Sequence, residues 1–371
     1  MRVKLEEVCK RIYAGGDVPK DRYSEVKTKE YPIPIYANAE KDNGLYGYTD
    51  KAREEELSIT VAARGTIGFT AIRREPFLPV VRLITVVPDT AKVSERYLYY
   101  VLKNCKPQSS GTSIPQLTVP DIKKNRLELY DISEQERIAD QLDTVSKVIE
   151  LRKQELEALD NLIKARFVEM FGIPIANTNN WPMDKAENLC TLVTDGSHFS
   201  PKACEEGYPM LSVKDMRQNG FDYSDCKLVD DETFEILKKQ GCVPQADDVL
   251  IAKDGSYFTR AFAITEYKDQ AILSSIGMYR PDIDKILPRF LASYLMTNEV
   301  IEFVNRGYVT GTALRRVIIK GLKNIPVYMP PMELQKEFVQ FAEQVDKSKV
   351  VYMSIHKKLG KQKKQIKYKI A

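Results

Sequence analysis

The stretch ISEQERIADQLDTVSKVIELRKQELEALDNLIKARFVEMF, residues 132–171, contains neither glycine nor proline, and Gly172 and Pro174 follow it. Its apolar residues recur in steps of four and three, a seven-residue repeat that indicates a helix packed along one narrow face against another helix. Ser133 and Glu136 have the spacing of a capping box, and Gly172 before Pro174 is typical of a helix end. At about 1.5 Å per residue a helix over the 39 residues 133–171 would be roughly 58 Å long, too long for the core of a compact domain.

The repeat occurs a second time, 200 residues further along the chain. The expected helix-pairing residues are Ile138, Leu142, Val145, Ile149, Leu156, Leu159 and Ile163 in the first copy and Phe338, Val345, Tyr352, Leu359 and Ile366 in the second. The second apolar face is poorer, because Lys349 and Lys363 occupy the positions of Ile149 and Ile163. Two copies at one fixed offset favour an intramolecular pair of antiparallel helices over two separate solvent-facing helices.

Length and composition are those of a globular protein with two domains. The chain has 371 residues, 43% of them hydrophobic and 29% charged, and a formal charge of +4 that allows an anionic partner without requiring one. No apolar run is long enough to span a membrane, and the polar residues 1–7 do not resemble a signal peptide. Six scattered cysteines without a C-x-x-C pair, and only two histidines, predict reduced thiols in a cytoplasm and no metal site.

The two segments that precede the long helices show the same order of strand and helix signals. In the first segment, residues 31–38, 57–63, 79–87 and 127–130 read as strands and 94–103 as a helix. In the second segment, residues 208–211, 249–255 and 289–298 correspond to residues 31–34, 59–65 and 94–103 of the first. The side chains between these anchors mostly differ, which indicates two divergent copies of one domain.

The expected fold class is therefore α+β, with two similar mixed α/β domains separated by two long antiparallel helices. These helices would form an intramolecular coiled coil, and the chain would have pseudo-twofold symmetry. The expected boundaries are a domain at 1–131, a helix at 132–172, a domain at 173–330 and a helix at 331–371. A linear ligand read at two places suits such a molecule, and duplex DNA at about 3.4 Å per base pair is the obvious candidate.

Four motifs carry a resemblance to a known family. They are AARGTIG at 62–68, ISEQERI at 132–138, TDGSHFSP at 194–201 and YPMLSVKDM at 208–216. In this order, and together with the duplication, they resemble the specificity subunit of type I restriction–modification systems, over essentially the whole chain. The second copy departs from the family pattern at MELQKE, residues 332–337, where Leu-Gln replaces the usual Glu-Gln pair.

The resemblance implies a non-catalytic reader of double-stranded DNA in the prokaryotic cytoplasm, associated with the nucleoid. Each domain would be a target recognition domain for one half of a bipartite asymmetric sequence. The helices would set the unread spacer and dock two adenine-N6 methyltransferase subunits, through which restriction and translocase subunits join. The resemblance implies no cofactor in this chain, while S-adenosylmethionine, ATP and magnesium would be bound by the partner subunits. The sequence itself contains no Walker A motif and no methyltransferase motif of the Asn-Pro-Pro-Tyr type.

Basic and amide side chains in loops are the candidates for DNA contact, because lysine and arginine bind phosphates while arginine, asparagine and glutamine read base edges. The expected DNA-binding residues are Lys20, Arg22, Arg64, Gln108, Gly111, Thr112 and Gln116 in the first domain and Lys214, Arg217, Lys253, Arg260, Gly311, Thr312, Arg315 and Arg316 in the second. The alternative for each charged residue is an ordinary solvated surface charge, and for each Gly-Thr loop a turn before a strand. His198 near Asp195 invites comparison with a catalytic dyad, but a structural or phosphate-facing loop histidine is the favoured interpretation.

Three functional classes stay open. The chain is a type I specificity subunit, a similar specificity subunit of another restriction class, or a non-catalytic adaptor whose duplicated domains bind protein. Partners with motor domains would separate the first two classes. DNA affinity that falls with salt would exclude the third. An enzyme acting alone is the least favoured class.

Overall fold

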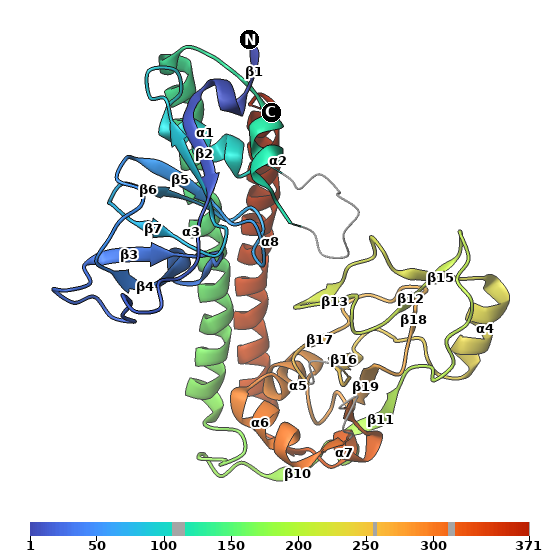
Figure 1. Cartoon of the computed structure of the whole chain (residues 1–371). Helices are drawn as coiled ribbons and strands as arrows, with labels where there is room; N and C mark the ends of the chain where they lie inside the picture. The colour runs from blue at the N-terminus through green and yellow to red at the C-terminus, as the bar shows by residue number, and fades with distance from the viewer. Residues whose placement is uncertain (106–115, 255–257, 311–315, 371) are drawn as a thin grey trace. The chain divides into compact units, whose positions relative to one another are not determined.

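The computed structural model describes residues 1–105, 116–254, 258–310 and 316–370 (Figure 1). The chain forms two compact units, one made of Met1–Gln154 with Tyr352–Ala371 and the other of Glu155–Val351. The long helices are α3 (Ile132–Phe171) and α8 (Met332–Tyr368), so each of them begins in one unit and ends in the other. None of the helices in the described ranges is long and apolar enough to span a membrane.

The first unit contains a four-stranded antiparallel sheet in the order β2-β8-β5-β6. Its strands are β2 (Cys9–Ala14), β5 (Ser58–Val61), β6 (Thr70–Arg73) and β8 (Ile84–Pro88). A second sheet has the order β4-β3-β7, from β3 (Ile33–Tyr36), β4 (Leu45–Thr49) and β7 (Leu78–Pro79), and a third pairs β1 (Arg2–Lys4) with β9 (Arg126–Glu128). The short helices are α1 (Glu95–Leu102), which packs on β5 and β6, and α2 (Val119–Lys124).

The second unit repeats this plan with additions. The main sheet has the order β11-β19-β16-β17, from β11 (Cys190–Asp195), β16 (Val249–Ala252), β17 (Ala261–Ala263) and β19 (Ile276–Pro281). The second sheet has the order β15-β12-β18, from β12 (Tyr208–Leu211), β15 (Lys227–Val229) and β18 (Ala271–Ile272), and β10 (Met183–Lys185) pairs with β22 (Pro326–Tyr328). Further elements are β13 (Met216–Arg217), β14 (Gly220–Phe221), β20 (Val309–Thr310), β21 (Arg316–Val317), α4 (Asp231–Lys239), α5 (Pro288–Leu295), α6 (Asn298–Gly307) and α7 (Ile319–Lys323).

Small irregularities are shared by the two units, which confirms the predicted duplication. The register of β2 on β8 shifts between Cys9 and Arg11, and the register of β11 on β19 shifts between Cys190 and Leu192. The helix α5 packs on β16 and β17 as α1 packs on β5 and β6. β16 thus has the place in the second unit that β5 has in the first, as the predicted correspondence of these segments requires.

The predicted single strand at 79–87 is wrong. Val81 and Arg82 have positive φ angles of 52° and 61°, so the chain turns there. The segment before this turn is β7, which pairs in parallel with β3, while the segment after it is β8, the second strand of the main sheet. Neither residue type favours positive φ, which is why the alternating apolar pattern gave no sign of the break.

The predicted capping box at the start of α3 is also wrong. Asp131 caps the helix, because its Oδ1 accepts hydrogen bonds from the Ser133 hydroxyl at 2.6 Å and from the Glu134 N–H at 2.8 Å. These two bonds hold the pKa of Asp131 below its ordinary value. Glu136 instead binds Arg96 of α1 at 2.9 Å. The predicted end of α3 is confirmed, since Gly172 has a φ of +76° and its N–H bonds to the Val168 carbonyl.

The long helices pack against each other in antiparallel fashion within the first unit. Ile138, Leu142 and Val145 of α3 are buried in one cluster with Ile366 of α8 and with Ile370, two residues beyond the end of α8. Ile149 and Leu359 pack against that cluster. The Tyr352 ring lies 5.0 Å from the Arg152 guanidinium. The seven-residue pattern thus predicted the buried face of both helices in this unit.

The second unit contains the other half of each helix. Ile163 and Phe167 of α3 are buried in one cluster with Phe338, Ala342 and Val345 of α8, and Leu159 packs against it. Leu156 is half-buried. Arg166 binds Glu337 at 3.0 Å and lies over the Phe341 ring. Lys349 lies at a helix-pairing position and is buried. Its ammonium forms ion pairs with Asp160 and, at 3.1 Å, with Asp346.

Two equivalent glutamines attach the long helices to the rest of each unit. Gln135 and Gln335 are both fully buried. Oε1 of Gln135 accepts a hydrogen bond from Ser94 N–H at 2.8 Å, and Oε1 of Gln335 accepts one from Leu287 N–H at 2.9 Å. Ser94 and Leu287 are the N-cap residues of α1 and α5, so each glutamine satisfies the same unpaired N–H in its own unit.

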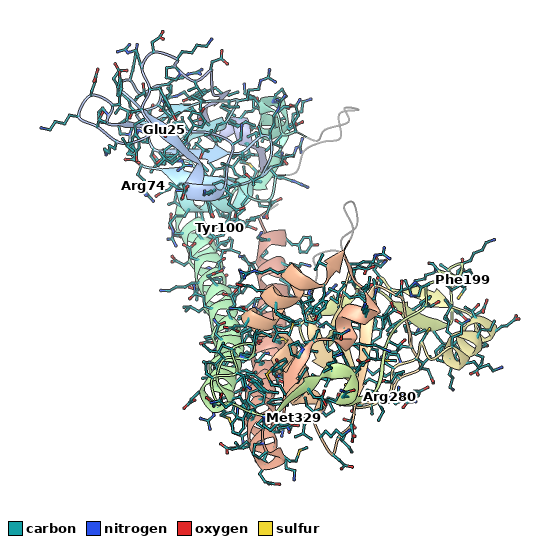
Figure 2. The ribbon with its side chains drawn as sticks, turned by 90° about the horizontal axis from the view of Figure 1, so that it is seen from below. Glu25, Arg74, Tyr100, Phe199, Arg280 and Met329 are labelled. Atoms are coloured by element: carbon teal, nitrogen blue, oxygen red, sulfur yellow. The ribbon has the colours of Figure 1, made fainter. Side chains whose placement is uncertain are left out.

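The two amide nitrogens also make equivalent bonds. Nε2 of Gln135 donates to the carbonyls of Lys92 and Tyr130, and Nε2 of Gln335 donates to those of Lys285 and Pro330. In the first unit, α1 is further attached to α3 through Tyr100, labelled in Figure 2, whose hydroxyl donates to Asp143.

Candidate nucleic-acid interface

The loop after β5 presents an arginine held by a glutamine. Nε and Nη2 of Arg64 both donate to Oε1 of Gln116, at 3.0 and 2.8 Å, although the two residues are 52 positions apart. The loop backbone is held by Asn38, whose Oδ1 accepts from Ala63 N–H at 2.7 Å, and it turns at Gly65 with a φ of +68°. Arg64 is exposed, and its guanidinium has five N–H donors, so donors remain for a ligand.

In the second unit, three of the predicted contact residues come together at the β13–β14 hairpin. The Met216 carbonyl accepts hydrogen bonds from Nη1 of Arg217 at 3.0 Å and from Nη1 of Arg260 at 2.8 Å. The Lys214 carbonyl accepts from Nη1 of Arg217 at 2.8 Å. Lys214, Arg217 and Arg260 are all exposed, so the hairpin carries a compact basic surface.

Asp222 orients one of these arginines. It binds Nη2 of Arg217 at 2.7 Å and accepts the Ser224 hydroxyl at 2.7 Å. The hydroxyl and backbone N–H of Ser224, followed by Arg217, lower the pKa of Asp222 to about 2. The carboxylate is therefore ionised at neutral pH and keeps the guanidinium of Arg217 in place.

Lys253 is a correction to the predicted contact residues. Its side chain is 3% exposed, and its ammonium forms ion pairs with Asp195 at 3.2 Å and Asp254 at 3.4 Å. A buried and paired ammonium does not present its charge to a phosphate. The equivalent ends of β5 and β2 in the first unit carry Ala63 and Ala14 instead, so this ion pair belongs to one copy of the domain alone.

His198 pairs with Asp195, three residues before it in the sequence. Its Nε2 lies 3.2 Å from Oδ1 of Asp195, and the imidazole is 72% exposed. The neighbouring Ser197 hydroxyl is bonded to the Phe199 carbonyl and accepts the Phe199 N–H. Asp195 is shared with Lys253, so the arrangement is that of a loop held by ion pairs rather than of an activated serine.

The other predicted contact residues are dispersed. Lys20 is exposed, and Arg22 is exposed and ion-paired with Asp50. Arg316 lies in β21, and its backbone forms an antiparallel β-bridge with Asp254. Six of the predicted residues lie outside the described part of the chain: Gln108, Gly111, Thr112, Gly311, Thr312 and Arg315.

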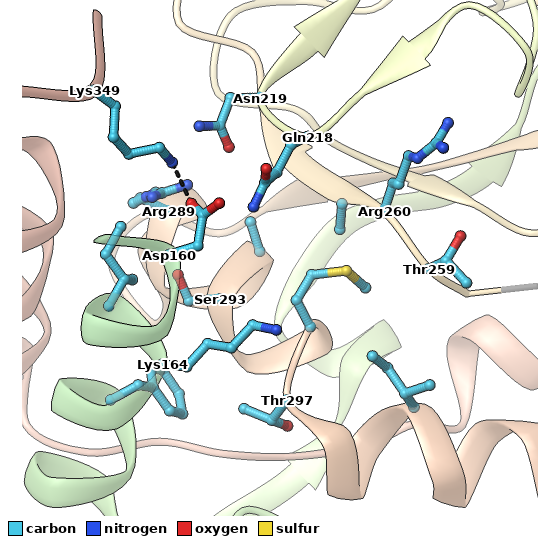
Figure 3. Close-up of a pocket in the computed structure, with 16 residues that line it drawn as sticks. Asp160, Lys164, Gln218, Asn219, Thr259, Arg260, Arg289, Ser293, Thr297 and Lys349 are labelled. Atoms are coloured by element: carbon cyan, nitrogen blue, oxygen red, sulfur yellow. Dashed lines mark hydrogen bonds and ion pairs between the residues drawn. The ribbon is translucent and has the colours of Figure 1, made fainter. Parts of the chain in front are cut away.

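A cavity of about 290 Å³ lies among the long helices, α5 and the β13–β14 hairpin of the second unit (Figure 3). Its polar lining includes Asp160 and Lys349 from the helices and Asn219 from the β13–β14 hairpin. Asn219 lies within hydrogen-bond distance of Asp346 and Lys349. The basic hairpin is therefore tied to α8. The sequence showed Lys349 only as a defect in the apolar face, because its partner Asp160 is 189 residues away.

The fold and these loops define a duplicated α+β protein in which each copy carries its own basic, amide-rich surface. The family model of the type I restriction modification DNA specificity domain matches residues 1–161 and 180–359. The chain belongs to this family. Both matched regions include a complete copy of the mixed α/β domain and part of a long helix.

Individual relatives agree with this assignment. The Mycoplasma pneumoniae protein S.MpnORF507P, which is named as a type I specificity subunit, is 33% identical over 165 residues, 42% of this chain and 45% of that protein. The specificity subunit of the type I enzyme EcoBI of Escherichia coli is 20% identical over 322 residues, 77% of this chain and 66% of that protein. The match spans 45% and 50% of the length of two Mycoplasma pneumoniae relatives, so the chain covers about half of each.

A solved structure shares the fold. The crystal structure of the S subunit of a type I restriction–modification system from M. genitalium aligns with a TM-score of 0.57 and 14% identity, over 100% of this chain and 95% of that one. At this identity the likeness concerns the fold alone. It places both long helices and both mixed α/β domains in one known architecture.

Proposed function

We propose that this chain reads a bipartite, asymmetric DNA sequence, one half with each mixed α/β domain. The observation that carries the proposal is the pair of equivalent domains that expose different basic side chains. The first domain carries Arg64 on Gln116 in the loop after β5, whereas the second carries Arg260 and, on the added β13–β14 hairpin, Arg217, both bonded to one carbonyl. Arginine on guanine O6 and N7 is the commonest specific contact in the major groove, and glutamine can read adenine.

We further propose that α3 and α8 set the length of the unread spacer and dock two methyltransferase subunits. The helix α3 is continuous over 40 residues and α8 over 37, so the length of each is well defined. In the second unit the helices expose Leu162 on α3 and Val350 and Val351 on α8, with exposed fractions of 47%, 62% and 58%. Exposed apolar side chains of this kind suit a docked partner subunit.

In this proposal the chain catalyses no reaction itself. S-adenosylmethionine, ATP and Mg²⁺ would be bound by the methyltransferase and restriction subunits, and the restriction subunits would join through the methyltransferase subunits. The family membership supports this division of labour, because the matched family is one of DNA specificity domains.

The test is genome-wide mapping of methyladenine in cells that express the methyltransferase with wild-type chain or with a variant. Arg64→Ala is expected to relax one half of the methylated sequence, and Arg217→Ala with Arg260→Ala the other half. An insertion of about four residues, roughly one turn, in α3 should change the spacer and leave both halves unchanged. Methylation without any sequence preference in the wild type, or a change of both halves by Arg64→Ala, would refute the proposal.

A further inference from the structure

From Lys347 to its end at Tyr368, α8 contains lysines but no acidic residue of its own. Residues 347–371 contain nine lysines and no aspartate or glutamate. The equivalent residues 147–171 of the first repeat contain five acidic residues. Because the two helices are copies of one another, a helix of this type does not require an all-lysine surface. The charge on α8 therefore calls for its own explanation.

Three lysines and a tyrosine of α8 form what we call the basic stripe: Lys357, Lys361, Lys364 and Tyr368. Their spacing of four, three and four residues places them along one face of the helix. All four are exposed, and Tyr368 has an exposed fraction of 80%. None of the three lysines forms an ion pair with any residue in the described ranges. Like charges on adjacent helical turns repel, so the stripe is unfavourable until an anion lies on it.

The basic surface continues onto the end of α1 in the same unit. Lys367 Nζ donates to Oδ1 of Asn104 at 2.8 Å. Burial, followed by repulsion from Lys103, lowers the pKa of Lys363, and burial followed by Lys363 and Lys103 lowers that of Lys367. The ammonium groups of Lys103, Lys363 and Lys367 thus lie beside the stripe and raise the local positive potential.

The composition of the surface decides between two classes of partner. Interfaces between proteins are depleted in lysine and centre on apolar or aromatic side chains. Gln362 and Gln365 directly follow the stripe residues Lys361 and Lys364, and both are exposed and polar. Interfaces with DNA are strongly positive and draw most of their affinity from lysine and arginine on phosphates. The stripe has the composition of a DNA interface.

We propose that the basic stripe binds the phosphate backbone of duplex DNA without reading its sequence. This inference rests on the proposed function, in which the chain binds duplex DNA. From Lys357 to Tyr368 the stripe extends about 16 Å along the helix. That length corresponds to roughly five base pairs at about 3.4 Å each. Lysine suits this task because its ammonium is a point charge on a flexible stem, with no fixed geometry to match to a base.

The experiment compares DNA binding by the full chain in complex with its methyltransferase, with wild-type chain or the variant K357Q/K361Q/K364Q. Fluorescence anisotropy is measured on a duplex with the methylated sequence and on a scrambled duplex, between about 50 and 200 mM salt. Each phosphate contact contributes about 0.9 to the slope of log affinity against log salt. The slope is expected to fall by about 2 to 3 on both duplexes, with the ratio of the two affinities unchanged.

The control is K357R/K361R/K364R, which keeps the charge and should keep the wild-type slope. Circular dichroism should give the same melting temperature for all three proteins, since the side chains are exposed. A wild-type slope in the glutamine variant overturns the inference, and so does loss of the methyltransferase from the complex without a change of slope. Equal affinity of the wild type for both duplexes would instead refute the proposed function, and the slopes would still decide the role of the stripe.

Discussion

Replacing Gln335 by leucine tests how each mixed α/β domain is attached to its long helix. The side chains are similar in size, but leucine removes one acceptor and two donated hydrogen bonds. The N–H of Leu287 and the carbonyls of Lys285 and Pro330 would then lose this partner inside the protein. Gln135→Leu removes the same set of bonds in the first unit, where Ser94 supplies the N–H.

The expected loss follows from the burial of these groups. A buried donor or acceptor left without a partner costs about 1–3 kcal/mol, and the N–H at the start of α5 has the fewest alternatives. Allowing for the gain from burying a leucine, Gln335→Leu should reduce the free energy of unfolding by roughly 2–4 kcal/mol. That is a large part of the roughly 5–15 kcal/mol that stabilises a typical domain.

Two measurements apply: urea denaturation, and hydrogen exchange detected by mass spectrometry. In Gln335→Leu, exchange should accelerate first in residues 285–295 and 331–339. In Gln135→Leu it should accelerate in residues 92–102 and 130–139. Gln344→Leu and Gln141→Leu are matched controls, because both glutamines are exposed on the same helices. If Gln335→Leu unfolded at the same urea concentration as Gln344→Leu, the buried glutamine would not be what holds α5 to α8.

Two further predictions concern the helix end and the thiols. Gly172→Ala should lower the melting temperature, since a φ of +76° costs alanine roughly 1–2 kcal/mol. Gly360→Ala inside α8 should raise the melting temperature, because alanine is more favourable than glycine inside a helix by about 1 kcal/mol. Equal shifts of the two melting temperatures in calorimetry would contradict this reasoning. Burial raises the pKa of Cys9, Cys105 and Cys190 to about 12, so iodoacetamide at pH 8 should label them only after unfolding, and rapid labelling of the folded protein, seen by mass spectrometry, would contradict the burial.

The long helices were the most predictable part of the fold, because their pattern repeats over many turns. Ile138, Leu142 and Val145 lie where the seven-residue repeat placed them, and so do Phe338 and Ile366. A helix that has one apolar face must bury that face, so the pattern and the packing carry the same information. The order of strands in the two domains was predictable for a related reason, since the second copy could be checked against the first.

The prediction failed where a contact joins distant segments or where the backbone adopts a conformation its residues do not favour. Lys253 looked like a surface charge, because its partner Asp195 lies at the end of a different strand. The turn at Val81 and Arg82 was invisible for the second reason. At the start of α3, Asp131 and Ser133 are both good capping residues, and only the hydrogen bonds of the structure decide between them.

The division of the long helices between the units has a consequence for biosynthesis. The second unit, Glu155–Val351, is one continuous segment, whereas the first needs both Met1–Gln154 and Tyr352–Ala371. A ribosome adds about 5–20 residues per second, so the nascent chain completes its second unit before the segment that covers Ile138 and Leu142 exists. Ile366 and Ile370, each translated 228 residues after Ile138 and Leu142 respectively, close the hydrophobic core that those earlier residues share.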